Sequence, residues 1–309
     1  MQKIVNEVHG EGYLYEHKLE KKFSEKNKTE FISGKITIAT DENCTNTVDF
    51  HFIYVTPVYS KSGKPNPNYK LLENIVNSGA DKTVMGGGKD NALKLRVDGQ
   101  IGVNDFVGAD KEIVTQVRNE VSFVNMATNL NENAGKRSSF KTDMLITGAF
   151  RKEADEEKNT QEHLVIKGAT FNDFTKALIP VSYSVYNPAA MTYFENLEPS
   201  SSTPVFTRVW GQICSQEFVS TIETKSAFGE SLIEERKSTR KEYVVTGAAS
   251  DCHEWDSEET ILASEVKAAM SNRELHLAEV KKNYEEYQAS KGVTSAKPAS
   301  NVAAGNFAF

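Results

Sequence analysis

The chain has 309 residues, of which 26% are charged and 39% apolar, a balance typical of a globular protein. No apolar run approaches the roughly 20 residues that span a bilayer, and residues 1–7 lack the apolar stretch of a signal peptide, so we expect a cytoplasmic protein. The net charge of −7 argues against non-specific binding of duplex DNA by the whole surface, although a local basic groove would still permit binding of nucleic acid.

The first predicted elements form a β-hairpin. Residues 31–40 and 48–59 are rich in β-branched and aromatic residues, and a turn-like segment at 41–46 separates them. Because side chains alternate across a strand, the second strand is predicted to place four apolar residues on one face: Val48, Phe50, Phe52 and Tyr54.

A short helix at 69–78 and a glycine loop at 86–88 are predicted to follow the hairpin. Strand patterns then recur along the rest of the chain, at 92–103, 120–126, 143–151, 163–171, 177–186, 205–216 and 242–248. This succession predicts a mainly β protein.

One short pattern repeats within these strands: glycine, one residue, then isoleucine, at Gly34, Gly99 and Gly211. Glycine inside a strand marks a bulge, a sharp bend or a close backbone approach, as in small coiled barrels. We therefore predict one or two OB-like β-barrels with a short inserted helix. Residues 1–135 would form the first, and residues 136–256 the second or a continuation of a single β body.

The end of the chain changes character. The spacing of apolar residues predicts a helix over 257–290, which either packs on the β body or serves assembly. Residues 291–309 have the composition of a disordered tail. This tail ends in Phe307 and Phe309, which are either a hook that docks on a partner or an accident of sequence.

No catalytic or metal-binding motif is found. The six histidines are scattered without HExxH or HxH spacing, and the glycines at 86–88 lack the spacing of a phosphate loop. The three cysteines, Cys44, Cys214 and Cys252, form no CxxC pair, so neither a disulfide framework nor a zinc site is expected. We predict a protein that is not an enzyme and needs no cofactor or metal.

Basic and aromatic residues cluster instead. Residues 60–96 contain seven basic and three acidic residues within this acidic chain. Cations neutralise phosphates and aromatic faces stack on unpaired bases, the combination that single-stranded nucleic acid requires. The predicted DNA-binding residues are Lys35, Tyr59, Lys61, Lys64, Tyr69, Lys70, Lys89, Lys94, Arg96, Lys136, Arg137, Arg208 and Trp210. For any one of them, a place in the core or on an ordinary solvated surface is the alternative.

Several segments give the chain a resemblance to bacteriophage proteins of the single-stranded DNA-binding class. They are SGKITIATDE (33–42), VDFHFIYVT (48–56), DNALKLRVDGQIGVNDF (90–106), DMLITGAFRKEADEE (143–157), EHLVIKGATFNDF (162–174), YFENLEPSSSTPVFTRVWGQI (193–213), SAFGE (226–230) and KEYVVTG (241–247). The resemblance implies an OB-like architecture and a role in phage DNA replication or recombination. One departure is the tail: many such proteins end in an acidic tail, whereas residues 291–309 contain no acidic residue.

The sequence therefore predicts a non-enzymatic protein that binds single-stranded DNA in the host cytoplasm. Replication or recombination proteins would be further partners, reached through Phe307 and Phe309, and a homo-oligomer is compatible with the C-terminal helix. Two alternatives stay open: a tail or capsid component of a phage virion, and an inhibitor that binds a host protein.

Overall fold

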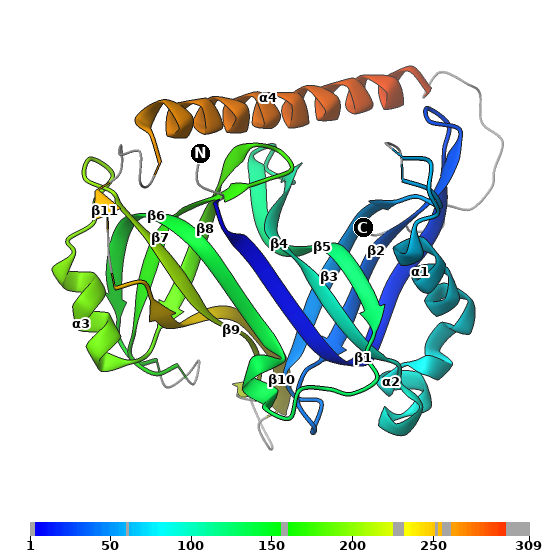
Figure 1. Ribbon diagram of the computed structural model, residues 1–309, viewed down its shortest axis with the longest axis horizontal. Coiled ribbons are helices and arrows are strands. Elements are labelled where there is room, and N and C mark those ends of the chain that lie inside the picture. Colours follow the sequence, from blue (N-terminus) through cyan, green and yellow to red (C-terminus); the bar gives the residue numbers. More distant parts are fainter. Residues whose placement is uncertain are drawn as a thin grey trace.

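The computed structural model describes residues 4–59, 62–155, 160–224, 232–250, 253–254 and 261–294. Within these ranges an 11-stranded sheet has the order β11-β9-β10-β8-β7-β6-β1-β2-β3-β5-β4, so the predicted mainly β class is confirmed (Figure 1). The strands are β1 (Asn6–Ser24), β2 (Thr29–Ala39), β3 (Thr47–Val55), β4 (Lys94–Val107), β5 (Ile113–Met126), β6 (Ser138–Lys152), β7 (His163–Asn172), β8 (Ala177–Val185), β9 (Val205–Thr224), β10 (Leu232–Ala248) and β11 (His253–Glu254).

The first five strands close into a barrel. Strand β1 pairs with β2 on one side and with β4 on the other, and β2–β3 and β4–β5 are also antiparallel. A parallel contact between β3 and β5 completes the circle. Helix α1 (Pro67–Ser78) lies between β3 and β4 in the chain and packs Leu72 and Ile75 into the core. Five strands in this order, with a helix after the third, form an OB barrel.

Strands β6 to β10 repeat the same circuit. Strand β6 pairs with β7 and β9, β7 pairs with β8, and β9 pairs with β10, all antiparallel. Strand β10 meets β8 in parallel, as β5 meets β3 in the first barrel. Helix α3 (Pro188–Asn196) again follows the third strand. The chain thus contains two OB barrels, which we call barrel 1 (β1–β5) and barrel 2 (β6–β10).

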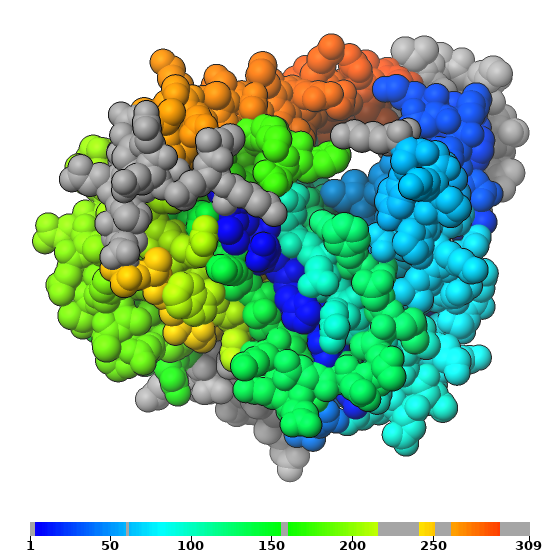
Figure 2. Space-filling model, in the orientation of Figure 1, coloured from blue at the N-terminus to red at the C-terminus, as the bar shows by residue number. Residues whose placement is uncertain are grey.

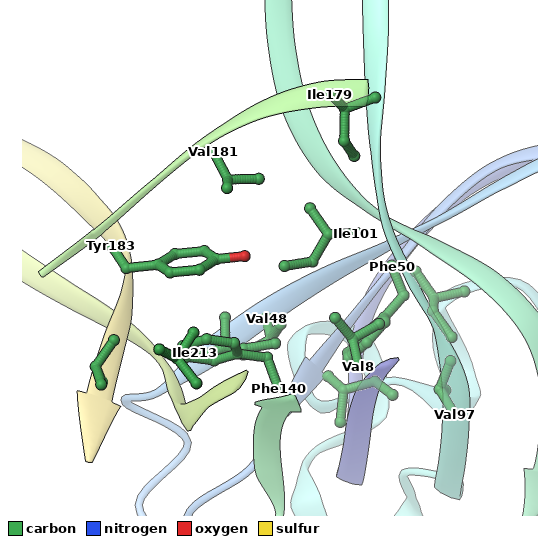
Figure 3. Close-up of a cluster of buried hydrophobic side chains, with 14 of the residues drawn as sticks. Val8, Val48, Phe50, Val97, Ile101, Phe140, Ile179, Val181, Tyr183 and Ile213 are labelled. Carbon is green, nitrogen blue, oxygen red and sulfur yellow. The ribbon is translucent and has the colours of Figure 1, made fainter. Parts of the chain in front are cut away.

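The two barrels share one hydrophobic core. Residues 6–10 of β1 pair with residues 138–142 of β6, which joins both barrels into one sheet. Figure 3 shows Val8 and Phe50 of barrel 1 close to Phe140 and Tyr183 of barrel 2, and all four belong to one buried cluster. The predicted boundary between residues 135 and 136 stays a prediction, because a continuous core leaves open whether either barrel folds alone.

Two glycines of the repeated pattern hold equivalent places. Gly99 on β4 pairs with Val8 of β1, and Gly211 on β9 pairs with Phe140 of β6. A Cβ at either position would lie 1.9 Å from a carbonyl oxygen of the next strand. Only glycine allows this approach, so Gly-Gln-Ile marks the fourth strand of each barrel. The third copy, Gly34, lies on β2 instead.

Strand β1 is the largest element that the sequence-based prediction missed. It carries glycines at positions 10 and 12 and many charged residues, so it lacks a clean alternating pattern. Yet Leu14 and Leu19 of β1 are buried, and the strand pairs with β2, β4 and β6. Helix α3 was also not predicted, while α1 begins two residues earlier than expected.

The prediction that Tyr54 shares a face with Val48, Phe50 and Phe52 is wrong. The register between β2 and β3 shifts from Gly34↔Phe52 to Ile32↔Val55. A residue inserted at such a bulge reverses the faces of those beyond it. Val55 therefore packs against the core, whereas Tyr54 is 42% exposed.

Helix α4 (Ala263–Thr294) crosses the top of the molecule above both barrels, as Figure 1 shows. Its first turns bury Val266 and Ala269 against Phe171, Leu178 and Phe206 of barrel 2. Farther along, Arg273 binds Asp105 of β4 through two hydrogen bonds of 2.5 and 2.6 Å. Among the described residues, no helix is long and apolar enough to cross a membrane. The predicted tail at 291–309 falls almost entirely outside the described residues.

Candidate nucleic-acid interface

Three of the predicted DNA-binding residues lie on or beside the β2–β3 side of barrel 1. Lys35 lies on β2 directly opposite His51 of β3. Tyr59 and Lys64 lie in the loop after β3, where the Tyr59 amide donates a 2.9 Å hydrogen bond to the Lys64 carbonyl. Tyr59 is 38% exposed and Lys64 is exposed, so both are accessible to a ligand.

Two predicted residues require correction because they are buried. Tyr69, in the first turn of α1, is 6% exposed and packs into the core, so its ring face is closed to a base. Arg137 is 5% exposed, and its guanidinium donates to the Glu42 carboxylate at 2.7 Å and to the carbonyl of Thr40. An arginine that is buried and already paired offers little to a phosphate, because leaving its partner would strand a buried group.

Four further predicted cations are committed to partners on other surfaces. Lys89 binds Glu42 at 2.6 Å, and both Lys89 and Lys94 lie over the ring of Tyr13. Arg96 binds Glu11 at 3.1 Å, and Arg208 forms a two-point ion pair with the buried Asp143. Trp210 is 40% exposed and lies two residues after Arg208 on β9. Lys70 and Lys136 are exposed at separate places on the surface. Lys61, Phe307 and Phe309 lie outside the described residues.

The predicted residues therefore do not form one surface. Arg96 lies on β4, and Arg208 and Trp210 lie on β9, away from the β2–β3 side. A cleft of about 700 Å³ is lined by β1, β4, β5 and β6, and in Figure 2 dark blue β1 runs between β6 and the β4–β5 pair. The charged side chains that line this cleft are three carboxylates against one lysine and one histidine: Glu7, Asp98, Asp173, Lys141 and His9. An acidic lining repels a polyanion, so we place the candidate interface elsewhere.

The outer face of β2 and β3 carries two aromatic residues, Tyr54, which is 42% exposed, and Phe31, which is half-buried. The rings of Phe31 and Tyr54 lie 4.5 Å apart between centroids, and the Tyr54 hydroxyl accepts a hydrogen bond from Asn27 in the β1–β2 turn. Farther along the same face lie Lys35 and His51. Strands two and three of an OB barrel, with the loops beside them, are where this fold binds oligonucleotides and oligosaccharides.

Barrel 2 presents an aromatic ring and a lysine on its first two strands, β6 and β7. Phe150 near the end of β6 is 54% exposed, and the Lys167 ammonium lies 5.4 Å from its ring centroid. Lys167 on β7 is opposite Ser182 of β8, so both side chains lie on the outer face. Each barrel thus shows an accessible aromatic ring and a lysine on its outer face, on β2 and β3 in barrel 1 and on β6 and β7 in barrel 2.

A cavity of about 330 Å³, which we call the seam cavity, joins the two outer faces. Asp49 and His51 of β3 line it from barrel 1, with Arg118 of β5. Ser182 of β8 and Lys241 of β10 line it from barrel 2. A continuous band therefore runs from Tyr54 through the seam cavity to Phe150.

Hydrogen bonds hold the charged groups of the seam cavity in place. The Asp49 carboxylate accepts from Thr37 at 2.7 Å, from Lys35 at 3.0 Å and from Lys241. Burial raises the pKa of Asp49, but these donors outweigh burial and hold it at about 2. Burial, together with the nearby Arg118, Lys35 and Lys241, lowers the pKa of His51 to about 4, although Asp49 acts in the opposite direction. His51 is therefore neutral at pH 7 and lies in a cationic field.

Five of these interface residues escaped the sequence-based assignment: Phe31, His51, Arg118, Phe150 and Lys167. They are scattered over five strands, and only the barrel closure brings them together. His51 carried a usable signal, because alternation along β3 places it on the outer face. Among the described residues, no group of three or more His, Cys, Asp or Glu side chains could hold a metal ion.

Comparison with known proteins yields a family and a distant structure. A family model described as YorF matches residues 4–283. None of the curated proteins matches the chain. One matching crystal structure is a deletion mutant of the single-stranded DNA binding protein from Thermus aquaticus. It is 9% identical with a TM-score of 0.46, and the alignment covers 84% of this chain and 100% of that chain.

Proposed function

We propose that this chain, which belongs to the YorF family, is a non-enzymatic protein that binds single-stranded DNA. The band from Tyr54 through the seam cavity to Phe150 is the binding surface. Phage DNA replication or recombination in the host cytoplasm is the setting we infer for this activity.

The observation that carries the proposal is the presence of aromatic rings and cations on the outer faces of both OB barrels. On barrel 1, Phe31 and Tyr54 share the outer face of β2 and β3 with Lys35, and on barrel 2 the Lys167 ammonium lies over the ring of Phe150. Bases stack on such rings with little sequence preference, and lysines neutralise the phosphates between them. Unpaired bases can reach a ring in this way, whereas the bases of a duplex are already stacked on one another.

The charge of the protein sets how this binding responds to salt. The net charge of −7 gives no general attraction for DNA, so affinity depends on the few cations of the band. Each phosphate contact releases counterions, so the logarithm of the binding constant falls by about 0.7 per contact for each tenfold rise in salt. We expect steep salt dependence and clear preference for single strands.

Fluorescence anisotropy with a labelled oligo-dT and a matched duplex, each over a salt series, tests the proposal. Tyr54→Ala and Phe150→Ala are each expected to weaken oligo-dT binding by about 1–3 kcal/mol per lost stack. Phe123→Ala is the matched control, because Phe123 is 57% exposed but lines the acidic cleft. Its affinity should equal that of the wild type.

Two results would contradict the proposal. One is the absence of oligo-dT binding at low salt, which would favour a virion component or an inhibitor of a host protein. The other is an equal effect of Tyr54→Ala, Phe150→Ala and Phe123→Ala, because binding would then lie outside the band. The roles predicted for Phe307 and Phe309, and a homo-oligomeric state, stay predictions.

A further inference from the structure

Two lysines from different barrels meet on one carboxylate in the seam cavity. Lys35 of barrel 1 and Lys241 of barrel 2 both bind the Oδ2 atom of Asp49, while Thr37 binds Oδ1. The side chain of Asp49 is 17% exposed and that of Lys241 is 47% exposed, so Lys241 remains accessible from solvent. A carboxylate that holds two ammonium groups occupies the position that a phosphate would take.

We propose that the seam cavity is a phosphate site, in which a phosphate group binds Lys241, Lys35 and a protonated His51. If the proposed function holds, this group is a backbone phosphate of the DNA strand as it passes from barrel 1 to barrel 2. Asp49 orders the lysines when the site is empty and competes with the phosphate for them.

The charge balance of the cavity explains why a proton accompanies the phosphate. The cations that face His51 are Lys35, Arg118 and Lys241. The carboxylates around these cations are Asp49, Glu120, which binds Arg118 at 3.0 Å, Glu16, which lies 4.0 Å from Lys35, and Glu242 of the cavity wall. These carboxylates already offset the three cations, so an added phosphate brings an excess of negative charge close to His51. Protonation of His51 offsets part of this excess, so phosphate binding should raise the pKa of His51.

Asp49 lowers the affinity of the site in this arrangement. A bound phosphate lies close to the carboxylate and shares its lysines, and like charges at such distances repel. Asp49→Asn removes the negative charge and keeps a side chain of the same size. We expect this variant to bind oligo-dT about 3- to 10-fold more tightly at low salt.

Proton NMR of the histidine ring, with the His51 signal assigned from His51→Gln, tests the site in the full-length protein. The pKa of His51 is measured without ligand, with inorganic phosphate, and with oligo-dT. A rise of one unit or more with oligo-dT supports the proposal, because one unit corresponds to about tenfold tighter binding to the protonated form. A similar rise with inorganic phosphate alone also supports the site and identifies free phosphate as a ligand.

Asp173→Asn is the matched control for Asp49→Asn, because Asp173 also pairs with a lysine, at 3.3 Å, but lines the acidic cleft. It should leave oligo-dT affinity unchanged. If oligo-dT binds but the pKa of His51 stays near 4 with either ligand, the phosphate site is refuted while the proposed function stands. If oligo-dT does not bind at all, the proposed function fails, and the inorganic phosphate titration alone decides the site.

Discussion

The ionic anchor between α4 and the β4–β5 hairpin allows one prediction to be worked through in detail. Asp105 has no exposed side-chain surface, and its carboxylate is held by Arg273, by the Thr115 hydroxyl at 2.7 Å and by His276 at 3.2 Å. Arg273→Ala removes the bidentate partner and leaves the carboxylate buried. Breaking a buried pair in this way costs about 3–5 kcal/mol.

The remaining partners set the magnitude within this range. Thr115 and His276 still contact Asp105 after the substitution, and the outer part of α4 can separate from barrel 1 to let water reach the carboxylate. We therefore expect the lower end, about 3 kcal/mol at pH 7. Equilibrium unfolding in urea measures this loss, and limited proteolysis within α4 reports any local separation.

The pH dependence of the same variant gives an independent check. Hydrogen bonds from Arg273 and Thr115 outweigh burial and lower the pKa of Asp105 in the folded protein. Its charged form therefore stabilises the wild type above the unfolded pKa near 3.9, and this contribution is lost as pH falls below that value. The difference between wild type and Arg273→Ala should be largest near pH 7 and shrink below pH 4.

Lys282→Ala provides the matched control on the same helix. Lys282 and Glu286 form an exposed pair at 3.8 Å, one turn apart, which is expected to contribute only about 0.3–0.5 kcal/mol. If Arg273→Ala destabilises the protein no more than Lys282→Ala does, the buried anchor is not holding α4 on barrel 1, and the reasoning is refuted.

Two further predictions concern the barrels themselves. Gly99→Ala and Gly211→Ala should each lower the melting temperature strongly and to a similar extent. The reason is that each new Cβ would meet a carbonyl oxygen of the neighbouring strand at 1.9 Å. A neutral result at either position would contradict the equivalence of the two glycines. Tyr183→Ala should lower the free energy of unfolding in urea by about 3–5 kcal/mol, because this fully buried ring packs on Phe140 where the barrels meet. A loss below about 1 kcal/mol would show that the barrels do not depend on this shared core.

Local patterns in the sequence predicted much of the fold. Alternating apolar residues indicate β2, β3, β7 and β8 to within a few residues, and the repeated Gly-Gln-Ile marks the fourth strand of each barrel. These signals are local, since strand alternation and close backbone approach restrict the residue types at positions next to one another in the chain. Strand β1 escaped because its core contacts are spread over three partner strands, and its own sequence is dominated by charged residues and glycine.

The binding surface depends on contacts between residues far apart in the chain, which no local sequence pattern indicates. A bulge between Phe52 and Val55 turns Tyr54 outward, and the closure of two barrels brings Lys35 and Lys241 onto one carboxylate although 206 positions separate them. Composition indicated cations and aromatic rings in a β protein. Only the tertiary structure decided which of them are buried like Tyr69, paired like Arg208, or aligned along one face, because burial and pairing depend on residues distant in the chain.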